Sequence, residues 1–177
     1  MSPAVRKLAL TVHVTSTLGW LGAVVVFLGL GVIGLTSRDA QTVRGVYLVM
    51  EPAAWRVLVP FAFASLATGI VQGLGTPWGL FRHYWVLFKL LLAVFVTIIL
   101  LIYMETFRVM AGVAADPSAD LALVRNVSPA LHALLALLVL FVATVLAVYK
   151  PRGVTRYGWR RQHERHAQST GPARQKA

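Results

Sequence analysis

Residues 8–35 read LALTVHVTSTLGWLGAVVVFLGLGVIGL, an apolar run interrupted only by His13 and a few Ser and Thr. A helix needs about 20 residues to cross the hydrocarbon core of a bilayer, so this run can cross it with some tilt. Arg6 and Lys7 precede the run as in a signal peptide, but no Ala-x-Ala cleavage site follows and the run is too long for a signal h-region. We therefore predict an uncleaved membrane helix.

Three further apolar runs follow, at about residues 54–74, 85–111 and 129–149. An unpaired backbone amide in lipid costs several kcal/mol, so only helices or closed barrels are stable there. Barrel strands would alternate in hydrophobicity, and these runs do not. The sequence predicts an all-α, polytopic membrane protein with a four-transmembrane-helix bundle.

The predicted membrane domain covers residues 1–153. Residues 36–53 are polar enough to be predicted as a connection between the first two helices. Residues 154–177 are basic and have no apolar period, which predicts a cytoplasmic tail without fixed structure.

The amino-acid composition is typical of a membrane protein. Hydrophobic residues make up 58% of the 177 residues and charged residues 13%, whereas soluble domains carry about 25% charged residues. The chain has no cysteine, which excludes disulfides, thiolate metal sites and thiol nucleophiles. It also lacks a phosphate-binding loop, a His-Glu-x-x-His motif and a nucleophile elbow, so we predict that it is not an enzyme.

The net charge of +11 is concentrated in the tail. From Lys150 onward there are eight Lys and Arg against one acid, Glu164, a balance of +7. Positive residues favour the cytoplasmic side, which predicts a multi-pass protein of the cell membrane with both termini in the cytoplasm. We expect the tail to contact anionic lipids of the bilayer, at about 1 kcal/mol for each Lys or Arg near the surface, and we expect no nucleic acid partner.

Polar side chains at membrane depth are costly, which makes them the first functional candidates. The predicted topology sorts them into two groups. The inner group, toward the cytoplasm, contains His13, Gln72, Arg82, His83 and Lys89. The outer group contains Glu51, Arg56, Glu105, Arg108 and His132.

The two helix-borne histidines, His13 and His132, suggest haem. Each lies near the start of its own helix and these helices run antiparallel, so the two should be roughly 15–20 Å apart along the membrane normal. A bis-histidine iron needs both nitrogens within about 2 Å, which argues against one shared haem. His13 shares a helix face with Ser16, Thr17 and Trp20. This face is interpreted either as a ligand, proton or quinone contact or as an interhelical hydrogen bond.

The remaining candidates have structural interpretations. Lys89 can extend its ammonium to the headgroups as an interfacial anchor. Glu105 and Arg108 are three residues apart on one helix and can pair. Small residues recur every fourth position in the second helix and predict a close helix contact: Ser65, Gly69 and Gly73.

Two segments carry a family resemblance: QGLGTPWGLFRHYWVLFK at residues 72–89 and VYKPRG at residues 148–153. Together with His13 they resemble a group of small uncharacterised bacterial integral membrane proteins, over about residues 5–155. The resemblance implies a four-helix membrane bundle and no established activity. His13 with the later Gly-Trp-Leu-Gly at 19–22 is also similar to the membrane domain of CopD-type copper-resistance proteins. The chain has only four Met, however, and lacks the Met-rich segments that suit copper.

Three functions remain open from the sequence. The first is a non-enzymatic helix-bundle or accessory protein. The second is a redox membrane protein that binds haem or quinone through His13. The third is a small transporter or channel that works as a homo-oligomer.

Overall fold

The computed structural model describes residues 2–76 and 79–169. Within them the chain is helical, with no strand beyond one isolated bridge. The helices are α1 (Pro3–Thr36), α2 (Ala40–Ala53), α3 (Val59–Gly75), α4 (Tyr84–Ala115), α5 (Ser128–Tyr149) and α6 (Arg156–Ser169), with a π-helical turn η1 (Ala54–Leu58) and a 3-10 turn η2 (Leu121–Leu123). Four stretches are long and apolar enough to cross a membrane. The predicted all-α four-helix bundle is confirmed.

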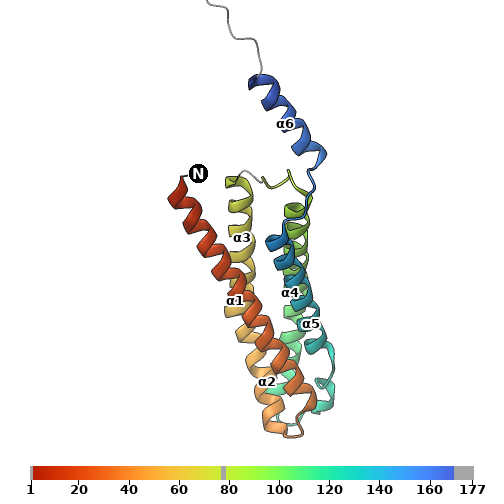
Figure 1. Cartoon of the computed structure of the whole chain (residues 1–177). Coiled ribbons are helices and arrows are strands. Elements are labelled where there is room, and N and C mark those ends of the chain that lie inside the picture. Colours follow the sequence, from red (N-terminus) through yellow and green to blue (C-terminus); the bar gives the residue numbers. More distant parts are fainter. Residues whose placement is uncertain (1, 77–78, 170–177) are drawn as a thin grey trace, which may run out of the picture.

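The long helices form a closed ring of neighbours (Figure 1). α1 packs against α3 and α5, α4 packs against the same two helices, and α2 packs against α1 and α4. We call the end that carries the N-terminus, the α3–α4 connection and α6 the terminal end, and the end with the α1–α2 and α4–α5 connections the distal end. In Figure 1 the terminal end is at the top.

The predicted polar connection at residues 36–53 is wrong, because most of it is α2. Asp39 begins this helix, since its carboxylate accepts hydrogen bonds from Thr42 N–H (2.8 Å) and from the Thr42 hydroxyl (2.6 Å). Apolar residues at helical spacing then face the bundle and are almost fully buried, among them Val43, Tyr47 and Met50. The charged residues within this stretch made the helical spacing of its apolar residues hard to recognise in the sequence.

The second membrane stretch also continues through two prolines. Pro52 and Pro60 have no N–H, so each leaves a carbonyl one turn earlier without its helical partner. Between them the chain widens into η1, where Val59 N–H bonds the carbonyl of Ala54, five residues back. The helix therefore runs from residue 40 to residue 75 instead of beginning at residue 54.

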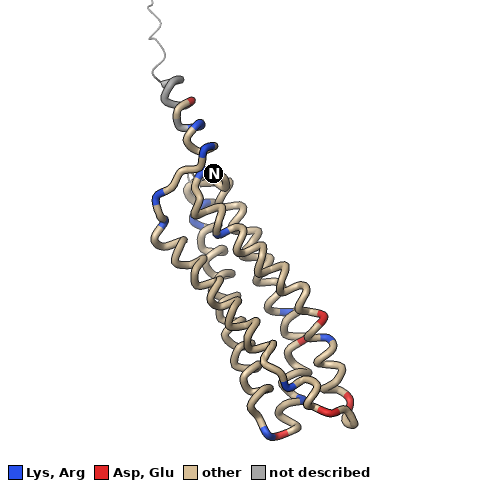
Figure 2. The backbone as a smooth tube through the Cα atoms, turned by 90° about the vertical axis from the view of Figure 1, so that its right-hand side faces the viewer, with Lys and Arg blue, Asp and Glu red and all other residues tan. Residues whose placement is uncertain are grey.

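The flanks of the bundle are apolar and exposed, as lipid contact requires. On α4 the exposed side chains include Phe88, Leu91, Phe95 and Ile102, and α5 presents Leu138 and Phe141 in the same way. Acidic and basic residues are distributed differently from each other along the bundle. Figure 2 shows Lys and Arg toward both ends of the bundle, whereas the acidic residues lie toward the distal end and on α6.

The predicted unstructured tail is wrong over residues 156–169, which form α6; residues 170–177 lie outside the described residues. Thr155 accounts for the helix start, because its hydroxyl oxygen accepts a hydrogen bond from Gly158 N–H (3.1 Å). The same hydroxyl donates to the carbonyl of Phe81 (2.6 Å), and Thr155 N–H donates to Arg82 O (2.9 Å). One residue thus begins α6 and attaches it to the α3–α4 connection.

Candidate functional site

A cavity of about 750 Å³ lies in the terminal half of the bundle. Its walls come from α1, α3, α4 and α5, and its lining extends from Arg6 and Lys7 near the helix ends to Trp20 nearer the middle. Sites for small molecules usually enclose about 300–1,000 Å³ with mostly apolar walls and a few polar groups. This cavity, called the terminal cavity below, fits that description. Most of its wall is aliphatic, with residues such as Leu10, Val14, Leu66, Leu90 and Val139.

His13 provides a polar group on the wall where α1 meets α3. Its Nδ1 lies 3.0 Å from Thr68 Oγ1. The single hydroxyl proton of Thr68 is already donated to the carbonyl of Ala64 (2.6 Å), so Thr68 must accept a hydrogen bond from His13 Nδ1–H. The neutral ring then carries its free lone pair on Nε2. Nε2 can accept a hydrogen bond or bind a metal.

The hydroxyls of Thr17 and Ser65 form a second contact between α1 and α3, one turn from His13. Thr17 Oγ1 donates to the carbonyl of His13 (2.9 Å), so it accepts from Ser65 Oγ (2.9 Å). Gln72 completes the row by donating from Nε2 to the carbonyl of Ala9 (3.0 Å). These hydrogen bonds join α1 to α3 and fix the rotamers of the side chains that make them. We call the four that line the cavity the polar row: His13, Thr17, Ser65 and Gln72.

Small residues of α3 allow this approach. A Cβ added to Gly69 would lie 3.2 Å from His13 Cε1, so the Nδ1–Cε1 edge of the imidazole faces α3. His13 also lines the terminal cavity. The predicted contact is confirmed for Ser65 and Gly69, whereas Gly73 faces Leu80 of the α3–α4 connection.

The charge in the terminal cavity has one sign. Its cationic lining residues are Arg6, Lys7, Lys89 and Lys150. The chain has six acidic residues, and none of them lines the cavity. Five lie between residues 39 and 120, toward the distal end, and Glu164 is on α6.

The structure brings together three residues of the predicted inner group: His13, Gln72 and Lys89 all line the terminal cavity. Arg82 and His83 do not line it. They lie in the α3–α4 connection, where Arg82 O accepts from Thr155 N–H and His83 forms a bridge with Val154.

The sequence interpretation missed Thr68 and Lys150. Thr68 follows Ser65 by three residues on the helix face that meets α1, and this spacing is a usable signal. Lys150 lines the cavity although it follows the last residue of α5.

The predicted outer group is divided. Glu105 and Arg108 form the predicted pair, with Arg108 Nε 2.7 Å from Glu105 Oε2, and both side chains are more than 60% exposed. Glu51 of α2 interacts electrostatically with Arg108. Arg56 is exposed on η1. These four charges line neither cavity and offer no enclosed site.

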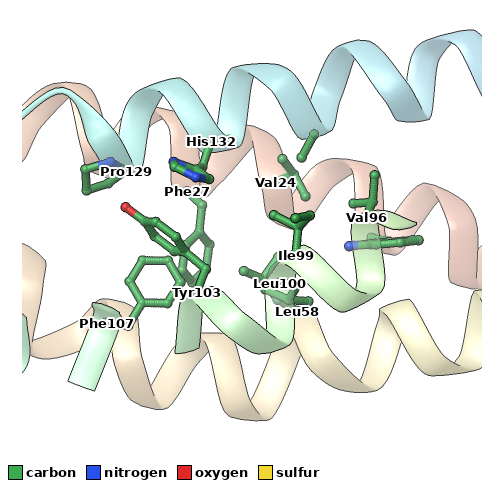
Figure 3. A pocket seen from close by; sticks show the side chains of 13 residues that line it. Val24, Phe27, Leu58, Val96, Ile99, Leu100, Tyr103, Phe107, Pro129 and His132 are labelled. Atoms are coloured by element: carbon green, nitrogen blue, oxygen red, sulfur yellow. The ribbon is translucent and has the colours of Figure 1, made fainter. Parts of the chain in front are cut away.

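His132 faces the interior instead (Figure 3). Its ring stacks on Tyr103 with centroids 4.3 Å apart, and its Nδ1 lies 2.9 Å from the carbonyl of Ser128, whose hydroxyl bonds Tyr103 Oη (2.9 Å). It lines a cavity of only about 70 Å³, which is too small for an organic cofactor. Trp20 lines both cavities and is 1% exposed, so its indole separates them. His13 and His132 therefore line different cavities.

Comparison with known proteins finds no protein family, curated protein or solved structure that matches the chain. The family resemblance therefore stays a prediction. Among the described residues, no three His, Asp or Glu side chains gather as a metal site would require.

Proposed function

We propose that this chain is a non-enzymatic binding protein of the bacterial cytoplasmic membrane, which holds a lipid-soluble ligand in the terminal cavity. The observation that carries the proposal is the cavity itself, about 750 Å³ with aliphatic walls and a fixed polar row on one side. A bundle that served only as scaffold would gain stability by filling this space, because interiors are otherwise close-packed. We place the terminal end in the cytoplasm, since the tail and the cavity mouth are rich in Lys and Arg.

Native mass spectrometry tests this proposal on the protein extracted in mild detergent. Ala143 lines the cavity from α5, and Ala143→Phe would occupy part of its volume. Ala67 is exposed on α3, away from the cavity, so Ala67→Phe adds the same ring to the outer surface as a matched control. We expect one retained small molecule per chain in the wild type and in Ala67→Phe, and none in Ala143→Phe. Equal retention in all three proteins, or retention in none, contradicts the proposal.

Haem binding is the second candidate, and the hydrogen bonding of His13 favours it. A ligating histidine usually donates its other ring N–H to a fixed acceptor, as Nδ1–H does here to Thr68. His13 would hold the iron through Nε2, and the haem would supply electron transfer when bound. We expect a Soret band in protein from haem-sufficient cells, lost in His13→Ala and kept in His132→Ala. A colourless, folded wild type rejects this candidate.

The channel hypothesis receives less support. Trp20 is buried between the two cavities, so the terminal cavity ends part of the way through the bundle. A pathway through one chain would have to displace this side chain.

A further inference from the structure

Lys89 places a positive charge on the wall of the terminal cavity, in the second turn of α4. Glu105 pairs with Arg108 and Glu164 with Arg161, and no described carboxylate forms an ion pair with Lys89. An ammonium within a membrane helix is costly unless an anion or water compensates for it. Over residues 2–76 and 79–169 no side chain provides such an anion, because all six Asp and Glu residues lie away from the cavity.

The other cations extend this charge toward the terminal end. Arg6 and Lys7 line the cavity from the first turns of α1, and Lys150 lines it where α5 ends. From this end to Trp20 the lining changes from cationic to aliphatic and aromatic. This gradient is complementary to a molecule with an anionic end and an apolar body.

The volume limits the size of the apolar body. A cavity of about 750 Å³ lies within the range of about 300–1,000 Å³ that suits one small organic molecule. We take a single acyl chain as the apolar body, because it belongs to this class of small molecules. The hydroxyls of Thr17 and Ser65 lie along one side of the same space and already bond each other between α1 and α3, so of this polar row His13 Nε2 is left to accept a hydrogen bond.

We propose that the ligand is a single-chain amphiphile with an acidic headgroup, bound with the headgroup at Lys89 and the chain directed toward Trp20. This inference rests on the proposed function and adds the chemical class of the ligand. The shared chemistry is an anionic head, which either a carboxylate or a phosphate monoester provides.

The test uses the full-length protein in nanodiscs of phosphatidylcholine, a lipid without net charge. Palmitate, methyl palmitate and hexadecyl phosphate are the probes, because they share a chain length and differ in headgroup charge. Binding is read from the rise in melting temperature with probe concentration, since a ligand that binds only the folded state stabilises it. We expect at least one acidic probe to bind about tenfold more tightly than the ester. The better acid identifies the headgroup.

Variants assign this preference to Lys89. Lys89→Met removes the charge and keeps an unbranched chain, so we expect the preference for the acid to disappear. Lys89→Arg keeps the charge and should keep the preference, as should Arg56→Met, which removes an exposed cation outside the cavity. Equal binding of acids and ester by the wild type overturns this inference and leaves the proposed function standing. Binding of no probe, together with no retained ligand in native mass spectrometry, overturns both. A preference that survives in Lys89→Met overturns the role of Lys89.

Discussion

The distal and terminal halves of the bundle differ in how completely their side chains fill the interior. In the distal half, Phe27, Tyr47, Met50 and Phe107 are each at most 5% exposed, and the cavity among these helices measures about 70 Å³. In the terminal half the helices leave about 750 Å³ open. The same four stretches of chain thus form a packed region and a hollow region.

We assign stability to the distal half and the proposed ligand binding to the terminal half. Within lipid, helix association depends on packing and interhelical hydrogen bonds, because the lipid chains are as apolar as the side chains. We therefore expect the packed distal half to supply most of this stabilisation. The terminal half relies on the His13–Thr68 and Thr17–Ser65 bonds, which hold α1 against α3 beside the open space.

The largest expected effect comes from removing a distal aromatic ring. Phe107 contacts Phe27 and Tyr103 edge to face, with ring centroids 5.6 and 4.9 Å away. Phe107→Ala should lower the free energy of unfolding by about 3–5 kcal/mol, measured by denaturant titration in detergent micelles. Leu90→Ala, on the wall of the terminal cavity, should cost less than about 1 kcal/mol because it leaves little new unfilled space. Equal losses would contradict the contrast between the halves.

A smaller effect is expected for Arg44, which joins α2 to the end of α4. Its guanidinium donates to the carbonyls of Ala114 (3.1 Å), Pro117 (3.1 Å) and Ala119 (3.2 Å), among others. A cation at a helix C-terminus also interacts favourably with the helix dipole. Arg44→Ala should cost about 1.5–3 kcal/mol in the same titration. Arg38→Ala, which removes an exposed cation nearby, is the control and should change little.

A local effect is expected at the attachment of α6. A Cβ on Gly158 would lie 2.5 Å from Arg82 O, so Gly158→Ala should separate α6 from the α3–α4 connection. We expect faster amide hydrogen exchange in α6 with an unchanged melting temperature of the bundle. Gly153→Ala is the matched control, because its Cβ would meet Tyr84 at an ordinary 3.6 Å. Unchanged exchange in Gly158→Ala would show that this contact does not hold α6.

The smallest effect concerns the start of α2 at low pH. Hydrogen bonds from the Thr42 hydroxyl and N–H hold the pKa of Asp39 below its ordinary value. Because the folded-state pKa lies below that of the unfolded chain, this contribution is complete above the unfolded value and is lost as the pH falls through the folded value. Between pH 6 and pH 3 the melting temperature of the wild type should fall slightly more than that of Asp39→Asn, which caps but does not titrate. Parallel curves would contradict this contribution.

The sequence predicts the bundle well because apolar runs of membrane length leave few alternatives to a helix. It fails at α2, where Arg44, Glu51 and Pro52 obscure the buried stripe of Val43 and Tyr47. The failure is physical: Arg44 and Glu51 lie beside the stripe, and the guanidinium of Arg44 donates to the carbonyls of Val113 and Ala114 at the end of α4.

The candidate site could be predicted only in part. Residue number gives depth along a helix, which correctly assigned His13, Gln72 and Lys89 to one end. It does not give the rotation of each helix or its neighbours. The interior position of His132, the exposed positions of Glu105 and Arg108, and the contact of Thr68 with His13 depend on those quantities.

The most direct test of the account compares two positions on α5 in a chain that has no cysteine of its own. Ala143 lines the terminal cavity, whereas Ala133 is 8% exposed within the packed distal half. The rates at which Ala143→Cys and Ala133→Cys react with N-ethylmaleimide should differ by at least about tenfold, because position 143 borders the cavity of about 750 Å³ whereas position 133 borders only the cavity of about 70 Å³. A fast reaction at position 143 with a slow one at position 133 is the predicted result. Equally slow reactions would show that the terminal half is as closely packed as the distal half, and would contradict the account.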